Sequence, residues 1–320
     1  MTQTSHSWKL QFILTSAIWG SSFLFIKVLD RHWPALWVAF GRVLLGALTL
    51  ALLVLARGER FPNDRRLWLH SFVAAGLFNA APFVLFAFGE KHVSSIVAGL
   101  WNATTPLWVL VILLLAFPEE RPTRDRLVGI GTGFLGVTLL LGPWRGLGGG
   151  QWIGDLACGG AALCYGLGFP YTRRYLASRG ESGVVLSACQ LGCAVGILAP
   201  FLLLAQAPSG HIGLDGWGSL LALGALGSGV AYAFNYAVVR ARGSAVASTV
   251  TYLIPVVSTV LGLVVLGEAL HWNQPLGALV LLAGIAVSQG ALRLSARAGQ
   301  STRGRTRFTQ GRVLPGPGDR

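Results

Sequence analysis

A single arginine, Arg42, stands deep inside a long apolar run of the chain. It follows Pro34 by eight positions, which places it roughly 12 Å along a helix that rises about 1.5 Å per residue. A guanidinium in such surroundings needs a partner. The candidates are backbone carbonyls, the nearby Glu90 and the carboxylate of a bound molecule, which a guanidinium grips with two parallel hydrogen bonds. The arginine side chain is also long enough to reach outward to the membrane surface. Two roles therefore stay open for Arg42: a structural contact that tethers its helix, and the binding of an anion.

Amide and aromatic side chains are spread through the other apolar runs. Each of three asparagines must find a hydrogen-bonding partner, either on a neighbouring helix or in a polar cavity. Tryptophan and tyrosine combine an apolar ring with a polar edge, which suits a small-molecule cavity, although aromatic residues also pack against one another. With the arginine, these side chains make up the predicted set of cavity residues: Trp19, Arg42, Asn79, Trp101, Asn102, Tyr165, Tyr232, Asn235 and Tyr252.

Other kinds of chemistry find little support in the sequence. The six histidines are scattered, without the spacing of metal ligands. The four cysteines lie in apolar runs, where a free thiol behaves as a small hydrophobe, so we assign them neither a disulfide nor a metal. The stretch GTGFLG, residues 131–136, has the glycine pattern of a dinucleotide site, but no strand precedes it. We interpret Gly129 and Gly133 there as a small-residue face for close helix packing. No cofactor, no metal and no enzymatic activity are therefore predicted.

The composition indicates which elements hold these side chains. With 53% apolar residues, 12% charged residues and a mean hydropathy of +0.61, the chain is too apolar for an ordinary soluble domain. A membrane-spanning helix needs roughly 20 mostly apolar residues. We expect the first run to be a retained helix, because no small-residue cleavage site follows it. Ten runs are predicted to span a membrane, at about 11–28, 35–56, 68–88, 93–116, 126–142, 152–171, 183–205, 217–238, 244–266 and 275–292.

Basic residues are shared unevenly between the two sets of turns. Of the 25 lysines and arginines, twenty fall at the N-terminus, in the turns after every second helix and in the C-terminal tail. The positive-inside rule therefore predicts that both termini are cytoplasmic. The tail, residues 294–320, has a disordered composition, and we expect it to be attracted to the anionic lipid bilayer rather than to nucleic acid.

The chain contains an internal repeat. The stretch PLWVLVILLLAFPE at 106–119 matches PVVSTVLGLVVLGE at 255–268, and without a gap the match extends back to pair residues 82–106 with 231–255. Further back, 17–27 pairs with 163–173. Ten helices are thus two copies of five. Because five is odd, a first copy that starts on one side of the membrane ends on the other side, so the second copy must be inverted. Inverted repeats are a known basis for alternating access.

The repeated stretch also supplies hinge and gate candidates. Pro106 and Pro255 should bend their helices at a hinge or a cavity, with a static kink as the alternative. Glu119 and Glu268 are candidates for gating or ion coupling, with a solvated helix-end carboxylate as the alternative. No Asp or Glu falls in the middle of a predicted span, which argues against a carboxylate proton relay. Facilitated export, exchange and proton coupling all stay open.

These features together resemble the EamA family of the drug/metabolite transporter superfamily. The resemblance covers about residues 8–293 and rests on the five-plus-five plan, the A-x-W-G element at residues 17–20, Phe40 with Arg42, Gly154 with Asp155, and the proline-to-glutamate spacing. It implies two EamA-like repeats, at 1–147 and 148–293, in a bacterial inner-membrane carrier whose cavity is central. We expect a carrier that exports a small metabolite, such as an amino acid or a related compound, by alternating access. A membrane-embedded enzyme acting on a lipid-linked substrate and a non-transporting subunit are the alternatives, and a homodimer is an open option for the assembly.

Overall fold

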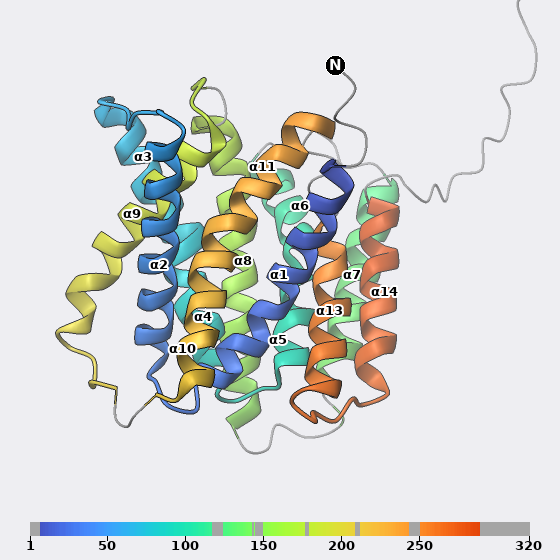
Figure 1. Ribbon diagram of the computed structural model, residues 1–320. Helices are drawn as coiled ribbons and strands as arrows, with labels where there is room; N and C mark the ends of the chain where they lie inside the picture. The colour runs from blue at the N-terminus through green and yellow to red at the C-terminus, as the bar shows by residue number, and fades with distance from the viewer. Residues whose placement is uncertain are drawn as a thin grey trace, which may run out of the picture.

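The computed structural model describes residues 7–116, 124–142, 144, 150–176, 179–208, 212–242 and 250–288. Throughout these ranges the chain folds into helices that pack side by side, and the ranges contain no strand (Figure 1). The prediction of an all-helical protein is therefore confirmed. Two predicted features, the gate candidate Glu119 and the basic tail 294–320, lie outside the described residues.

The helices follow the apolar runs closely. Two segments of wider π-helix, η1 (Gly76–Ala80) and η4 (Ala222–Val230), each continue directly from one α-helix into the next. The helices are α1 (Ser7–Leu29), α2 (Ala35–Ala56), α3 (Arg65–Ala75), α4 (Ala81–Gly89), α5 (Ser95–Asn102), α6 (Thr105–Ala116), α7 (Arg124–Leu141), α8 (Gln151–Tyr175), α9 (Gly183–Leu202), α10 (Leu214–Leu221), α11 (Ala231–Arg242), α13 (Val250–Val264) and α14 (Asn273–Ser288).

Six helical segments of the described chain are long and apolar enough to cross a membrane. They are Trp8–Leu29, Ala35–Ala56, Arg65–Gly89, Ser95–Leu115, Gly183–Leu202 and Leu214–Val238. Three shorter apolar helices accompany them, at Leu127–Leu141, Val250–Val264 and Asn273–Ser288. Several large apolar side chains point outward, including Leu52 and Leu204, which are 68% and 88% exposed. An outward apolar surface of this kind suits a bundle whose solvent is lipid.

Most helix pairs join the first half of the chain to the second. Helix α7 packs along α14, α2 along α9, α1 along α13, and α4 and α6 along α8. Figure 1 shows α7 and α14 together at one edge of the bundle, and α2 and α9 at the other. The start of α1 and the end of α14 lie at the same end of the bundle (Figure 1).

Glycine allows the closest of these contacts. A Cβ atom on Gly129 would lie 2.6 Å from the carbonyl oxygen of Gly284, and one on Gly277 would lie 2.5 Å from the backbone nitrogen of Leu140. Both distances are too short for a side chain, so α7 and α14 touch backbone to backbone. The small-residue face that the sequence predicts at Gly129 is a contact surface in the structure.

The helix expected over residues 93–116 is in fact two helices. Helix α5 ends at Asn102, and a turn at Ala103 and Thr104 precedes α6. Pro106 consequently lies in the first turn of α6 rather than in a helix interior. This is where proline fits best, because the first backbone N–H groups of a helix have no partner within it. Pro255, by contrast, lies inside α13, which continues through it without a break.

Candidate functional site

Arg42 is buried inside the bundle, with only 8% of its surface exposed. Its Nε donates a hydrogen bond of 3.0 Å to the Oγ of Ser228, which belongs to η4. Its guanidinium carbon lies 3.7 Å from the centre of the Phe83 ring, in cation–π geometry. The side chain therefore stays inside the bundle instead of reaching outward, and it links α2 to α4 and η4. Both of these contacts are with neutral groups.

Three predicted cavity residues meet beside this arginine. The Asn79 amide nitrogen donates to the hydroxyl oxygen of Tyr232 at 3.2 Å. The ring of Trp19 meets the Tyr232 ring edge to face, with centroids 5.7 Å apart, and its Nε1 donates to the carbonyl oxygen of Gly227 at 2.9 Å. Both π-helical segments take part, since Asn79 lies in η1 and Gly227 in η4. Wide helical turns of this kind are frequent at functional sites.

Tyr165 extends the cluster toward α8. Its ring centre lies 5.9 Å from that of Phe78 and 6.1 Å from that of Phe86. The hydroxyls of Tyr165 and Tyr232 are both near enough to Arg42 to interact with its charge. Tyr165 and Tyr232 remain partly exposed although they lie among core residues, whereas Asn79 is fully buried.

The phenylalanines of this cluster were missed by the sequence reasoning. Phe83 stacks under the guanidinium, and Phe86 packs edge to face on Phe23 with ring centres 5.4 Å apart. A phenylalanine in an apolar run looks like any core residue, so its type carries no signal. The internal repeat does contain a signal for them. Its offset pairs Phe83 with Tyr232 and Phe86 with Asn235, and both of these partners are predicted cavity residues.

Trp101 and Tyr252 belong to an adjoining core cluster that also includes Phe23 and Phe86. The Trp101 Nε1 donates to the Asp155 Oδ1 at 2.8 Å, and this bond anchors α5 to α8. The bare backbone of Gly159 faces the indole, where an added Cβ would lie 3.1 Å from the ring. In the sequence, Asp155 is noted only as part of a family motif, and nothing there predicts its hydrogen bond with Trp101.

Two of the predicted asparagines lie at the edge of the cluster. Asn102 is 9% exposed and is the last residue of α5, just before the break. Asn235 follows Tyr232 by one helical turn, and its Oδ1 is buried without a hydrogen-bond partner in the described part of the chain. An unpartnered buried amide oxygen is unusual in a native structure.

Glu268 has a defined structural position. Its carboxylate accepts hydrogen bonds from the backbone N–H of Ser95 at 2.8 Å, from the Ser95 hydroxyl at 2.9 Å and from the backbone N–H of Ile96 at 3.1 Å. A carboxylate at a helix N-terminus satisfies orphan donors and complements the helix dipole. A residue from the turn after α13 thus caps α5 in the other half of the chain.

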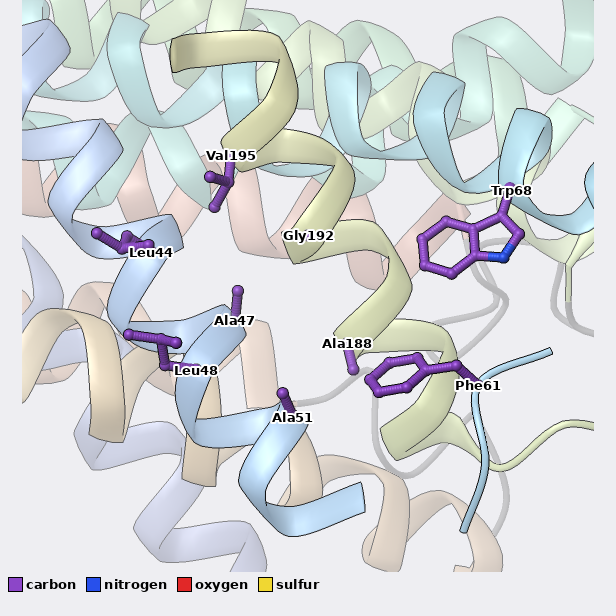
Figure 2. A pocket seen from close by; sticks show the side chains of 9 residues that line it. All are labelled: Leu44, Ala47, Leu48, Ala51, Phe61, Trp68, Ala188, Gly192 and Val195. Carbon is purple, nitrogen blue, oxygen red and sulfur yellow. The ribbon is translucent and has the colours of Figure 1, made fainter. Parts of the chain in front are cut away.

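A surface groove lies apart from this cluster. Figure 2 shows its lining, which comes from α2, α9, the start of α3 and the segment just before α3. The groove has a volume of about 490 Å³. Its lining is apolar: Leu44, Ala47, Leu48, Ala51, Phe61, Trp68, Ala188, Gly192 and Val195. None of the predicted cavity residues reaches it, and nothing in it could orient a polar molecule. As for metals, the described residues hold no cluster of three or more His, Cys, Asp or Glu side chains.

Comparison with known proteins shows which family the chain belongs to. The profile of the EamA-like transporter family matches the chain twice, over residues 6–142 and 152–289. The chain belongs to this family. Among its EamA-like relatives, the uncharacterized inner membrane transporter YedA of Escherichia coli is 25% identical over 79% of this chain and 81% of its own. Protein PecM of Dickeya dadantii is 24% identical over 88% of this chain and 91% of its own.

Another relative matches most of the chain, and a solved structure shares its fold. The uncharacterized protein PA1977 of Pseudomonas aeruginosa is 31% identical over 82% of this chain and 85% of its own. A crystal structure with 23% sequence identity superposes with a TM-score of 0.62 and covers 90% of this chain and 99% of its own. The family and the YedA name describe transporters, so this EamA-like chain is a membrane protein of a transporter family.

Proposed function

We propose that this protein is a carrier of the bacterial inner membrane that exports a small metabolite with a carboxylate group, such as an amino acid or a related compound. The observation that supports it most directly is the environment of Arg42. Its guanidinium is buried, its Nε bonds to a neutral hydroxyl and its face rests on a phenylalanine ring. A buried positive charge with neutral contacts favours binding of an anion, and a carboxylate matches the guanidinium fork.

The aromatic rings around Arg42 indicate that the substrate also has an apolar part. Trp19, Tyr165 and Tyr232 combine apolar faces with polar edges next to the guanidinium. Such a mixture suits a small amphipathic molecule whose charged end meets Arg42 and whose apolar part meets the rings. The proposed substrate site is therefore the group Trp19, Arg42, Asn79, Tyr165 and Tyr232, with Phe83 as its floor.

The proposed transport cycle is alternating access between two inverted five-helix repeats. In support, the family profile matches once in each half of the chain. The two π-helical segments also correspond, because the repeat offset carries residues 76–80 onto 225–229, inside η4. Under that offset Asn79 corresponds to Ser228, so equivalent positions of the two halves supply polar groups to one site. Two similar halves around a central site can exchange conformations.

The proposed orientation places both termini in the cytoplasm, as the basic residues of the turns favour. The ends of α1 and α4 then face outward. The turn between α2 and α3 and the turn between α8 and α9 face inward, where Arg179 pairs with Asp64 and the Ser182 hydroxyl donates to the Glu59 carboxylate.

Export profiling tests the proposed function. The protein is overexpressed in bacterial cells, and the growth medium is compared with that of cells producing Arg42→Ala at the same membrane level. Enrichment of one class of carboxylate-bearing metabolite, lost in the variant, is the expected result. A class enriched equally by the variant would remove Arg42 from the site, and no enriched class with either protein would contradict export.

A further inference from the structure

Two carboxyl groups are buried at the end of the bundle where α1 and α4 finish. Asp30 directly follows α1, and Glu90 directly follows α4. The Glu90 side chain is fully buried, and all four carboxyl oxygens of the pair are inaccessible. Among the described residues, no group donates a hydrogen bond to any of them. An ionised carboxylate in this situation is costly, so its negative charge must be neutralised by something that binds it.

The neighbouring lysines do not form ion pairs with these carboxyl groups. Lys27 directs its Nζ to backbone carbonyl oxygens, that of Val93 at 2.7 Å and that of Glu90. Lys91 likewise donates to the carbonyl oxygen of Trp33 at 3.0 Å. Their positive charges act on the pair only through space. The carboxyl oxygens of Asp30 and Glu90 thus have no hydrogen-bond partner among the described residues, and each can accept a proton.

Other charged and titratable groups approach from the remaining elements. Arg42 acts on Glu90 from α2, and Glu268 acts on it from the turn after α13 while its own oxygens are held by the start of α5. Helix α8 contributes Cys158, whose thiol interacts with Glu90, and Asp155, whose carboxylate is bonded to Trp101. The pair is therefore the meeting point of elements from both halves of the chain.

Burial and mutual repulsion both favour protonation here. Burial raises the pKa of Asp30 to about 8, against the opposing charges of Lys91 and Lys27. Burial also raises the pKa of Glu90 well above its usual range, and the charge of Asp30 adds to this rise. Two interacting carboxyl groups titrate as a unit, so the proton belongs to the pair.

A proton suits this pair better than a metal ion does. Lys27 already places a positive charge beside the carboxyl groups, and that charge repels a second cation. A proton needs no further ligands, whereas a metal ion such as Na⁺ needs several oxygens around it. Protonation also turns one carboxylate oxygen into a hydrogen-bond donor, which can satisfy an unpartnered acceptor beside it.

We propose that Asp30 and Glu90 form a proton-binding site linked to anion binding at Arg42. This inference rests on the proposed function, which makes Arg42 the anion site and places the pair at the external end. When that end opens, a proton passes from external water to a carboxylate oxygen of the pair. Protonated Glu90 no longer attracts the guanidinium, which is then free for the substrate carboxylate. Proton and substrate therefore favour each other's binding, as linkage requires.

Infrared titration of the full chain in lipid nanodiscs tests the site without a known substrate. The wild type is expected to show the C=O band of protonated carboxyl groups at neutral pH, and to lose intensity as the pH rises through about 8. The double variant Asp30→Asn, Glu90→Gln should lack this change. Asp215→Asn, which removes an exposed carboxylate from the start of α10, is the matched control and should titrate as the wild type does.

Three results would overturn the inference: no titrating band in the wild type, an unchanged band in the double variant, or a midpoint that shifts when sodium replaces choline in the buffer. If the double variant does not fold, the single variants Asp30→Asn and Glu90→Gln replace it, and each should lose part of the band. Export profiling separates the two proposals. Metabolite export without a titrating band would contradict only the proton site. A titrating band without any exported metabolite would contradict the carrier and leave the proton site standing.

Discussion

Arg42 on α2 and Ser228 in η4, 186 residues apart in sequence, are joined by a 3.0 Å hydrogen bond in the core of the bundle. The bond ties a helix of the first half to the π-helical segment of the second. It also fixes the guanidinium over the Phe83 ring, close enough to Tyr165 and Tyr232 to interact with them through its charge. One polar contact therefore both links the two halves at this point and orients the proposed anion-binding group.

Removing the Ser228 hydroxyl should destabilise the protein and disturb the site. Ser228→Ala leaves the buried Arg42 Nε without an acceptor, which costs about 1 to 3 kcal/mol. We expect a lower midpoint of thermal unfolding in detergent and weaker export. Ser21→Ala is the control, since the Ser21 hydroxyl bonds only to the backbone of its own helix at Ile18. Equal midpoints for the two variants would show that the interhelical bond adds no stability.

Asn102 and Asn235 should be reachable from water if they border the cavity. In a background with the four native cysteines changed to serine, we expect Asn102→Cys and Asn235→Cys to react with a water-soluble thiol reagent. Leu52→Cys, on the outward apolar surface of α2, is the control and should stay unlabelled because lipid suppresses the thiolate. Full protection of both asparagine positions would argue against a cavity beside them.

Glu268 should stabilise α5 through its carboxylate. Glu268→Gln keeps one acceptor oxygen but loses the charge that complements the helix N-terminus, and we expect a loss of about 1 kcal/mol in the free energy of unfolding. Thermal unfolding in detergent measures this loss, with the exposed Glu181→Gln as the matched control. If the Glu268 variant unfolds at the same temperature as the control, the three hydrogen bonds at Ser95 and Ile96 contribute no net stability.

Asp30 should make the folded state less stable as the pH rises. Its pKa is raised from 3.8 to about 8 by burial, so between these values the folded chain keeps a proton that the unfolded chain releases. Stability falls across this window because the folded state binds more protons. The variant Asp30→Asn removes the titration, and its unfolding midpoint relative to the wild type should rise with pH. Asp215→Asn should show no such trend, and a constant difference for Asp30→Asn would refute the raised pKa.

The proposed orientation predicts opposite labelling of two neighbouring turns. In the same cysteine-free background, Arg31→Cys lies in the turn after α1 and Arg57→Cys at the end of α2, and both positions are exposed. A reagent that cannot cross membranes should label Arg31→Cys in intact cells and Arg57→Cys only after the cells are opened. The reverse pattern would invert the orientation, and it would move the Asp30–Glu90 pair to the cytoplasmic end.

Much of the site was open to prediction because polar residues in apolar runs are few. Residue type and depth alone predict a set of cavity residues that includes Trp19, Arg42, Asn79, Tyr165 and Tyr232, and the structure brings these five together. The phenylalanines carry no such signal, because in an apolar run nothing distinguishes a ring that contacts a cation from one that contacts a leucine. The burial of Glu90 has no signal in the sequence, since its position at the end of a helix says nothing about what covers it.

The amino-acid sequence is enough to predict that the chain is helical, apolar enough for a membrane and built from two related halves. These properties depend on composition and periodicity, which act locally along the chain. Which helices pack together, and which partner each polar group contacts, became visible in the folded chain. The tertiary structure broke the run at 93–116 into α5 and α6, placed Glu268 on the start of α5, and buried the carboxyl groups of Asp30 and Glu90. Burial and partnership arise between elements distant in sequence, so no local pattern of residues encodes them.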